Sequence, residues 1–169
     1  MNHFPMMARF NQWANQKLYA SVAALPEDRY RADLGLFFGS IHRTLNHLLV
    51  VDRIWTRRID GEPHGIASLD AQLYAGFIEL SGARAEEDER LVRLVDGLGE
   101  EQLARLVRYR RIIGSGEAET RCSHILLTLF NHQTHHRGQV HAALTQSGIE
   151  PPPLDVVFFL SERPDAARL

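Results

Sequence analysis

Three histidines lie within five residues in the run Asn131-His132-Gln133-Thr134-His135-His136. His132 and His136 are four positions apart, so a helix would place both imidazoles on one face, about one turn from each other. That spacing lets one helix present two nitrogen ligands to a single metal ion. The two-histidine motif of zinc proteases needs a glutamate directly after the first histidine, whereas this chain has Gln133. A zinc-protease site is therefore disfavoured.

Apolar residues share a helical sector with these two histidines, and that sector also contains Gln139. Its apolar members are Leu129, Val140 and Ala143. We expect the sector to face the interior, where two unpaired imidazoles would be costly and where one metal ion would satisfy both. Two histidines that bond to backbone or water near the end of a bundle are the alternative. The spacing alone leaves both interpretations open.

A third ligand must come from another helix, and His47 is the best candidate. It precedes Val51 and Ile54 by one and two helical turns, although a satisfied core histidine would show the same pattern. His42 has an ambiguous direction. Asp52 is rotated by about 140° from His47 on a helix, so we interpret it as a polar partner for another helix.

The residues favour a mononuclear three-nitrogen site. The Glu-x-x-His pattern of di-iron bundles does not occur in this chain. Three imidazoles suit zinc, nickel, iron(II) or copper, and the ligand types do not choose among them. Cys122 lies about 15 Å along the helix from His132, too far to close the site, so we interpret it as a small residue at the helix start.

The elements that must position these residues are four helices with apolar periodicity. We expect them from about Pro5 to Leu25, from Ser40 as N-cap to Gly61, from Ser68 to near Gly97, and from Ser123 to Ser147. The stretch from Glu27 to Gly39 is expected to be a connection. The charge run 86–90 is expected to be a solvated helix face.

Between the third and fourth helices, basic and apolar residues alternate and are followed by Gly114-Ser115-Gly116, which predicts a small hairpin. The apolar tail from Leu154 to Leu160 is expected to pack back on the helices. The prediction is an all-α protein, a four-helix bundle with a small β-hairpin inserted before the fourth helix. Residues 1–169 are expected to form one domain.

Composition bounds the partners and the location. The chain has 169 residues, 44% of them hydrophobic, and a net charge of −2, which gives no drive toward nucleic acid or anionic lipid. The N-terminus lacks the features of a signal peptide, and no apolar run approaches the roughly 20 residues of a membrane span. The single cysteine excludes an intrachain disulfide. We therefore expect a cytoplasmic protein with no nucleic-acid or membrane partner.

Three blocks of the sequence resemble the DinB-like family. The run 130–139 looks like its signature, and the similarity continues through residues 144–148, Pro152 and Asp155. Asn46-His47-Leu48-Leu49 with Asp52 and Trp55 resembles the family's second-helix motif, and the run 11–15 resembles its first-helix motif.

The resemblance implies a DinB/YfiT-like four-helix bundle with a three-histidine metal site, whose ligands by motif position are His47, His132 and His136. It also implies a homodimer and a link to stress response, since the family name comes from DNA-damage induction. Some related bundles are S-transferases or isomerases that use bacillithiol, mycothiol or glutathione.

Two functional hypotheses follow. The first is a metal-dependent enzyme acting on a small molecule, because three histidines leave coordination positions open. A low-molecular-weight thiol or a water would be activated there for S-transfer or hydrolysis, with Gln139 and His135 as candidates to orient the substrate or a ligand. The alternative is a non-catalytic metal-binding module with a role in stress response or binding.

Overall fold

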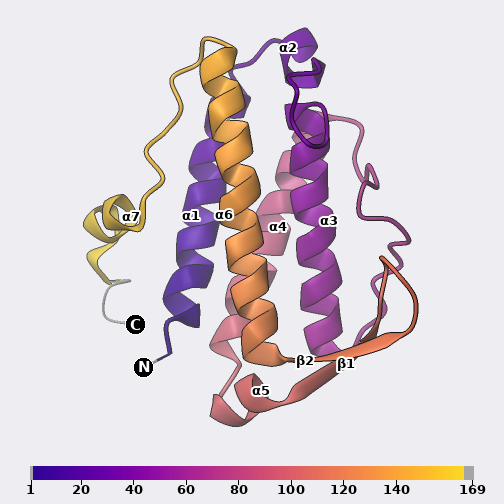
Figure 1. Cartoon of the computed structure of the whole chain (residues 1–169). Coiled ribbons are helices and arrows are strands. Elements are labelled where there is room, and N and C mark those ends of the chain that lie inside the picture. The colour runs from indigo at the N-terminus through magenta and orange to yellow at the C-terminus, as the bar shows by residue number, and fades with distance from the viewer. Residues whose placement is uncertain (1, 166–169) are drawn as a thin grey trace.

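Four long helices dominate the computed structural model, which describes residues 2–165 (Figure 1). They are α1 (Phe4–Val22), α3 (Ile41–Asp60), α4 (Phe77–Asp96) and α6 (Cys122–Gln146). Helices α1 and α3 each pack against both α4 and α6, which places α1 and α3 on opposite sides of the bundle. The predicted four-helix bundle is confirmed.

Short elements complete the fold: α2 (Glu27–Arg31), α5 (Glu100–Ala104), β1 (Leu106–Arg110), β2 (Glu117–Arg121) and α7 (Val156–Glu162). The two strands are antiparallel and form the predicted hairpin directly before α6. Gly114 and Gly116 have positive φ angles of 80° and 88° in its turn. Within residues 2–165, no helix is both long enough and apolar enough to cross a membrane.

Capping residues that were predicted from the sequence mark the start and the end of α3 and the end of α6. Ser40 precedes α3, and its hydroxyl accepts a hydrogen bond from the backbone N–H of Arg43 at 3.2 Å. Gly61 follows α3 with a φ of 74°, and Gly148 lies just beyond α6 with a φ of 77°. Both glycines adopt the left-handed backbone that stops a helix.

The start of the third predicted helix is wrong. Helix α4 begins at Phe77, and residues 62–76 form an irregular segment beside α3 (Figure 1). The Asn46 amide on α3 holds this segment, because it donates to the Tyr74 carbonyl at 3.2 Å and accepts from the Tyr74 N–H at 3.0 Å. A side chain thus satisfies backbone groups that a helix would otherwise pair internally. The predicted connection 27–39 likewise contains the short helix α2.

The apolar tail packs back on the bundle as predicted. Phe159 of α7 is buried, and its ring lies 5.8 Å from that of Phe10 and 5.7 Å from that of Trp13. Lys17 pairs with Glu162 at 2.9 Å beside this contact. The predicted single-domain organisation of residues 1–169, whose ends lie outside the described residues, stays a prediction.

The charge run on α4 is only partly solvated, which corrects the prediction. Glu86 and Glu89 are exposed, but Glu87 and Asp88 are buried. The Glu87 carboxylate accepts from the Thr56 hydroxyl at 2.7 Å. The reason is that α4 presents these carboxylates to polar groups on other helices, which the local sequence does not reveal.

A buried ionic layer crosses the bundle at Asp88. Arg84 Nη1 lies 2.8 Å from Asp52 Oδ2, and Arg84 Nη2 lies 2.9 Å from Asp88 Oδ1. Asn15 of α1 donates to Asp88 at 2.9 Å, and Gln133 of α6 donates to Asp52 at 2.5 Å. The layer therefore joins all four long helices, and Asp52 is the interhelix partner that the sequence predicted.

Candidate metal centre

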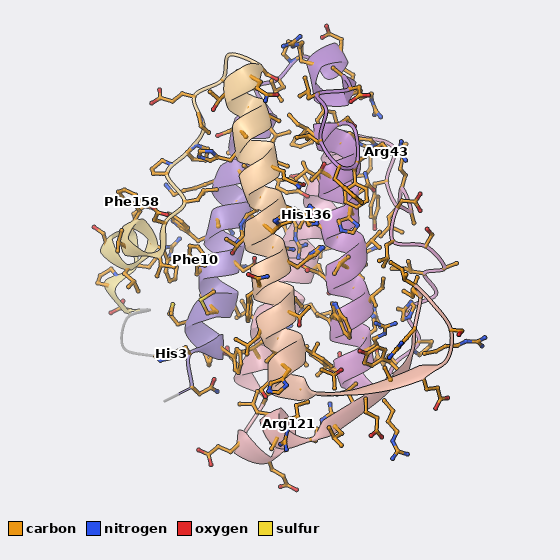
Figure 2. The ribbon with its side chains drawn as sticks, viewed as in Figure 1. His3, Phe10, Arg43, Arg121, His136 and Phe158 are labelled. Atoms are coloured by element: carbon orange, nitrogen blue, oxygen red, sulfur yellow. The ribbon has the colours of Figure 1, made fainter. Side chains whose placement is uncertain are left out.

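The structure brings His47, His132 and His136 together. His47 lies on α3, and the other two lie one turn apart on α6. One ring nitrogen from each lies within 4.8 Å of the other two. Figure 2 shows His136 on the side of α6 that faces α3. The predicted convergence of the three imidazoles is therefore present, and their Nε2 atoms form its centre, with His47 and His132 2.9 Å apart at Nε2.

Two of the rings are oriented by partners on their outer nitrogens. The Leu69 carbonyl accepts a hydrogen bond from His47 Nδ1 at 2.7 Å, and Gln139 Oε1 accepts one from His136 Nδ1 at 2.8 Å. Because a neutral imidazole carries one proton, both rings present an unprotonated Nε2 to the centre. Such partners fix the tautomer of metal-binding histidines.

The third ring, His132, is held differently. Its Nδ1 is buried without a hydrogen-bond partner, while its Nε2 faces His47. Buried polar atoms without partners are uncommon in folded proteins. A proton on this Nδ1 would free Nε2 to act as a ligand, in the same way as the other two rings.

All three imidazoles are kept neutral. Burial, followed by repulsion from His136 and His47, lowers the pKa of His132 to about 3. Burial is also the main reason why the pKa of His47 falls to about 4, and it lowers the pKa of His136. Neutral imidazole is the form that binds metals. With the His132 proton on Nδ1, three unprotonated nitrogens surround one point, and this set fits a divalent ion of the zinc, nickel or iron(II) kind.

The histidines lie at the edge of two cavities. The α6 sector that carries two of them faces the interior as expected, because Leu129, Val140 and Ala143 are fully buried and His136 is buried. The loop-side cavity, about 610 Å³, is lined among others by Phe37, Phe38, Ser68, Asp70, His135 and Gln139. The hairpin-side cavity, about 600 Å³, is lined among others by Val51, Trp55, Arg58, Tyr109, Arg111 and Glu119. His47 and His132 line both, as do Leu69, Ile112 and Ile113.

The contacts of the other residues considered in the sequence analysis show where each of them lies. His135 is exposed, and its Nε2 lies 3.3 Å from the Gln139 amide nitrogen. Gln139 itself holds His136, which matches the predicted orienting role for this residue. His42 is a satisfied core histidine bonded to the Tyr30 hydroxyl at 2.8 Å. Cys122 is buried at the first position of α6.

Sequence reasoning missed two residues that contact the centre and one that lines the hairpin-side cavity. Leu69 lies in the segment that was predicted to be helical, and only its backbone oxygen takes part. Phe38 stacks on His47 with ring centroids 4.0 Å apart. Arg58 lines the hairpin-side cavity. The spacing of Arg58, eleven residues after His47 and thus on the same helix face, was the one signal that was available.

The fold is a helical bundle, and three imidazoles converge at the edge of two cavities. These features place the protein among helical bundles with a candidate mononuclear metal centre. The sequence model of the DinB family matches residues 1–166, and the chain belongs to that family. It is 28% identical over 157 residues to Protein DinB of Bacillus subtilis (strain 168), a match that covers 89% of this chain and 90% of that protein. No solved structure gives a significant match.

Proposed function

We propose that His47, His132 and His136 bind one divalent metal ion through Nε2 and that the protein is a metal-dependent enzyme. The observation that carries the proposal is the set of three neutral imidazoles whose Nε2 atoms converge where two cavities meet. Three protein ligands leave coordination positions open, which is typical of catalytic zinc sites and not of structural ones. With zinc, we expect metal–nitrogen distances of about 2.0 to 2.2 Å.

The chemistry best supported is thiol-dependent S-transfer or hydrolysis of a small molecule. A divalent ion, when bound, would supply Lewis acidity that lowers the pKa of a thiol or a water. The chain supplies neutral ligands, so the charge of the ion is not reduced by a carboxylate. Phe38, Ile112 and Ile113 add apolar surface to the cavity beside the centre.

Two cavities that share His47 and His132 favour a reaction with two small reactants. A low-molecular-weight thiol in one cavity and an electrophile in the other would meet at the shared residues. Hydrolysis would need only one of them. Zinc or nickel as the native metal, a homodimer, a cytoplasmic location and a role in stress response stay predictions of the sequence.

The metal site is tested with protein purified without a histidine tag. We expect the wild type to bind about one equivalent of zinc or nickel by elemental analysis, and the variants His47→Ala, His132→Ala and His136→Ala each to lose it. His135→Ala is the matched control, because its position on the helix is rotated by about 100° from His136 and its Nε2 lies beside the Gln139 amide nitrogen. Equal loss of metal in all four variants would contradict the assigned ligands.

The reaction is tested on the metal-loaded protein with model electrophiles plus bacillithiol, mycothiol or glutathione, and with panels of esters and amides. We expect turnover that disappears when the metal is chelated and returns when it is restored. A metal-loaded protein that binds no thiol and turns over no substrate in either panel would overturn the enzyme proposal. The non-catalytic metal-binding module would then stand.

A further inference from the structure

One face of α3 forms a continuous wall of the hairpin-side cavity. His47, Val51, Ile54, Trp55 and Arg58 recur at helical spacing along it, and all five line the cavity. His47 begins this stripe and Arg58 ends it. Their α-carbons are separated by about 16 Å at a rise of ~1.5 Å per residue. The cavity therefore has a metal-ligand end, an apolar middle and a cationic end.

The Arg58 guanidinium has a defined position at its end of the cavity. Its central carbon lies 4.7 Å from the ring centroid of Trp55 and 4.3 Å from that of Tyr109. Its Nη2 donates to the Arg110 carbonyl at 2.7 Å. Two aromatic rings and one hydrogen bond thus restrict the side chain, while its other N–H groups stay available as donors.

Within residues 2–165, Arg58 has no carboxylate at ion-pair distance, in contrast to its neighbours. Arg53 pairs with Glu87 at 3.7 Å, and Arg57 pairs with Glu62. A half-buried cation without a counterion, next to an apolar cavity, is a binding feature for an anion, because its charge is screened less than that of an exposed arginine.

The other charges of the cavity do not cancel this one. Arg111 adds a second cation to the lining. Glu119 is the one carboxylate among the lining residues, and it is paired with Arg108. The cavity is therefore positive at the end away from the histidines. Its volume of about 600 Å³ lies in the range of small-molecule sites.

We propose that the hairpin-side cavity binds an elongated small molecule with an apolar body and a terminal carboxylate, and that Arg58 binds this carboxylate. The apolar body lies along Val51, Ile54 and Trp55, and the opposite end reaches His47 and His132, the two histidines that line this cavity. Placing the reactive end at the histidines rests on the proposed function. The contact between Arg58 and the carboxylate does not depend on it.

The test uses octanoate as the anionic probe and octanol as its uncharged counterpart. Trp55 lines the cavity and contacts Arg58, and Trp13→Phe leaves it as the single tryptophan of the chain. Binding is followed by Trp55 fluorescence in this background. The protein is metal-free at pH 7.5, so that no ion competes for the carboxylate and the imidazoles are neutral.

We expect octanoate to bind about tenfold more tightly than octanol, as one charge-assisted contact implies. Arg58→Met should remove this preference, and Arg58→Lys should keep part of it. Arg57→Met is the matched control, since it removes an adjacent arginine that does not line the cavity, and it should keep the full preference. Thermal unfolding shows whether each variant is folded.

Equal binding of octanoate and octanol by the Trp13→Phe protein would overturn the proposal, and that measurement needs no substitution at position 58. A preference that survives in folded Arg58→Met would overturn it as well. Because the titration uses neither metal nor thiol, failure of the metal-dependent activity would leave its result unchanged. The two proposals can therefore fail separately.

Discussion

At the scale of single residues, the outer nitrogens of the histidines decide how the candidate centre works. The Leu69 carbonyl and the Gln139 side-chain oxygen each accept a hydrogen bond from Nδ1 of one ring, and both rings then present their Nε2 lone pairs inward. His132 has no such partner on Nδ1. The three rings are therefore fixed to different degrees, and Gln139 is the one orienting group that substitution can remove.

Replacing Gln139 tests this orienting role. Gln139→Leu removes the acceptor of His136 Nδ1, so we expect the affinity for zinc to fall about 10- to 100-fold, as for other partners of metal-bound histidines. Gln139→Glu keeps an acceptor oxygen and should restore most of the affinity. Competition with a chromophoric chelator measures both. Unchanged affinity in Gln139→Leu would show that His136 needs no orienting partner.

The lowered histidine pKa values predict how stability depends on pH. In the metal-free protein the pKa of His132 is about 3 and that of His47 about 4, against an ordinary value of 6.5. At these two histidines the unfolded chain therefore binds more protons than the folded one below pH 6.5, so their contribution to stability falls as the pH decreases from 6.5 toward 4. Burial raises the pKa of Asp52 to about 7, which acts in the opposite direction.

This dependence is measured by urea unfolding of the metal-free protein from pH 8 to pH 4. His132→Gln removes one of the titrating groups, so its stability should fall less steeply than that of the wild type in this window. The comparison isolates the histidine, because the carboxylates are common to both proteins. Parallel curves for the two proteins would mean that His132 titrates normally.

At the scale of secondary-structure elements, the ionic layer sets how the helices meet. Arg84 of α4 lies between Asp52 and Asp88, and all three side chains are almost fully buried. Burying such charges is costly, so the layer contributes more to fixing helix register than to stability. It also places Gln133, and with it the α6 turn that carries His132, against α3.

Removing the central cation should therefore be severe. Arg84→Met leaves two buried carboxylates side by side, and we expect the free energy of unfolding to fall by about 3 to 5 kcal/mol. Arg93→Met on the same helix breaks an exposed pair with Glu89 and should change it by about 1 kcal/mol or less. Urea unfolding measures both. Similar losses in the two variants would contradict the role of the layer.

The limits of a helix are predicted correctly where the sequence carries a local capping signal. The caps at Ser40, Gly61 and Gly148 gave the limits of α3 and the end of α6. The start of α4 was misplaced because Asn46, distant in sequence, holds the segment before it. The burial of Asp88 was missed for the same reason, since Asn11 and Asn15, which donate hydrogen bonds to it, lie on α1.

For the candidate centre too, local patterns were predictable, whereas contacts between distant segments were not. Its α6 histidines were predictable because a four-residue spacing fixes a helix face. His47 was placed by its apolar neighbours and by the family resemblance, and the structure brings it to the other two. Leu69 and Arg58 were not predicted, because their roles depend on where the irregular segment and the hairpin lie.

At the scale of the whole molecule, the bundle carries the histidines while the connections form the walls of the cavities. The segment 62–76 and the hairpin both lie beside α3 (Figure 1). The hairpin turn supplies Ile112 and Ile113 to both cavities, and Ile113 is 73% exposed. Ile113 is exposed and Ile112 is half-buried outside the core clusters, which indicates that these two side chains serve the cavities more than the core.

Substituting both isoleucines distinguishes a role in the cavity wall from a role in stability. The double variant Ile112→Ser, Ile113→Ser should keep the unfolding temperature within about 3 °C of the wild type, since Ile113 is exposed and the half-buried Ile112 belongs to none of the core clusters. It should bind octanol at least about threefold more weakly, because burying apolar surface provides that affinity. Ile78→Ser is the control: Ile78 is 82% exposed on α4 and lines neither cavity. If the double variant binds octanol as tightly as Ile78→Ser does, the hairpin turn does not form a wall of the binding site.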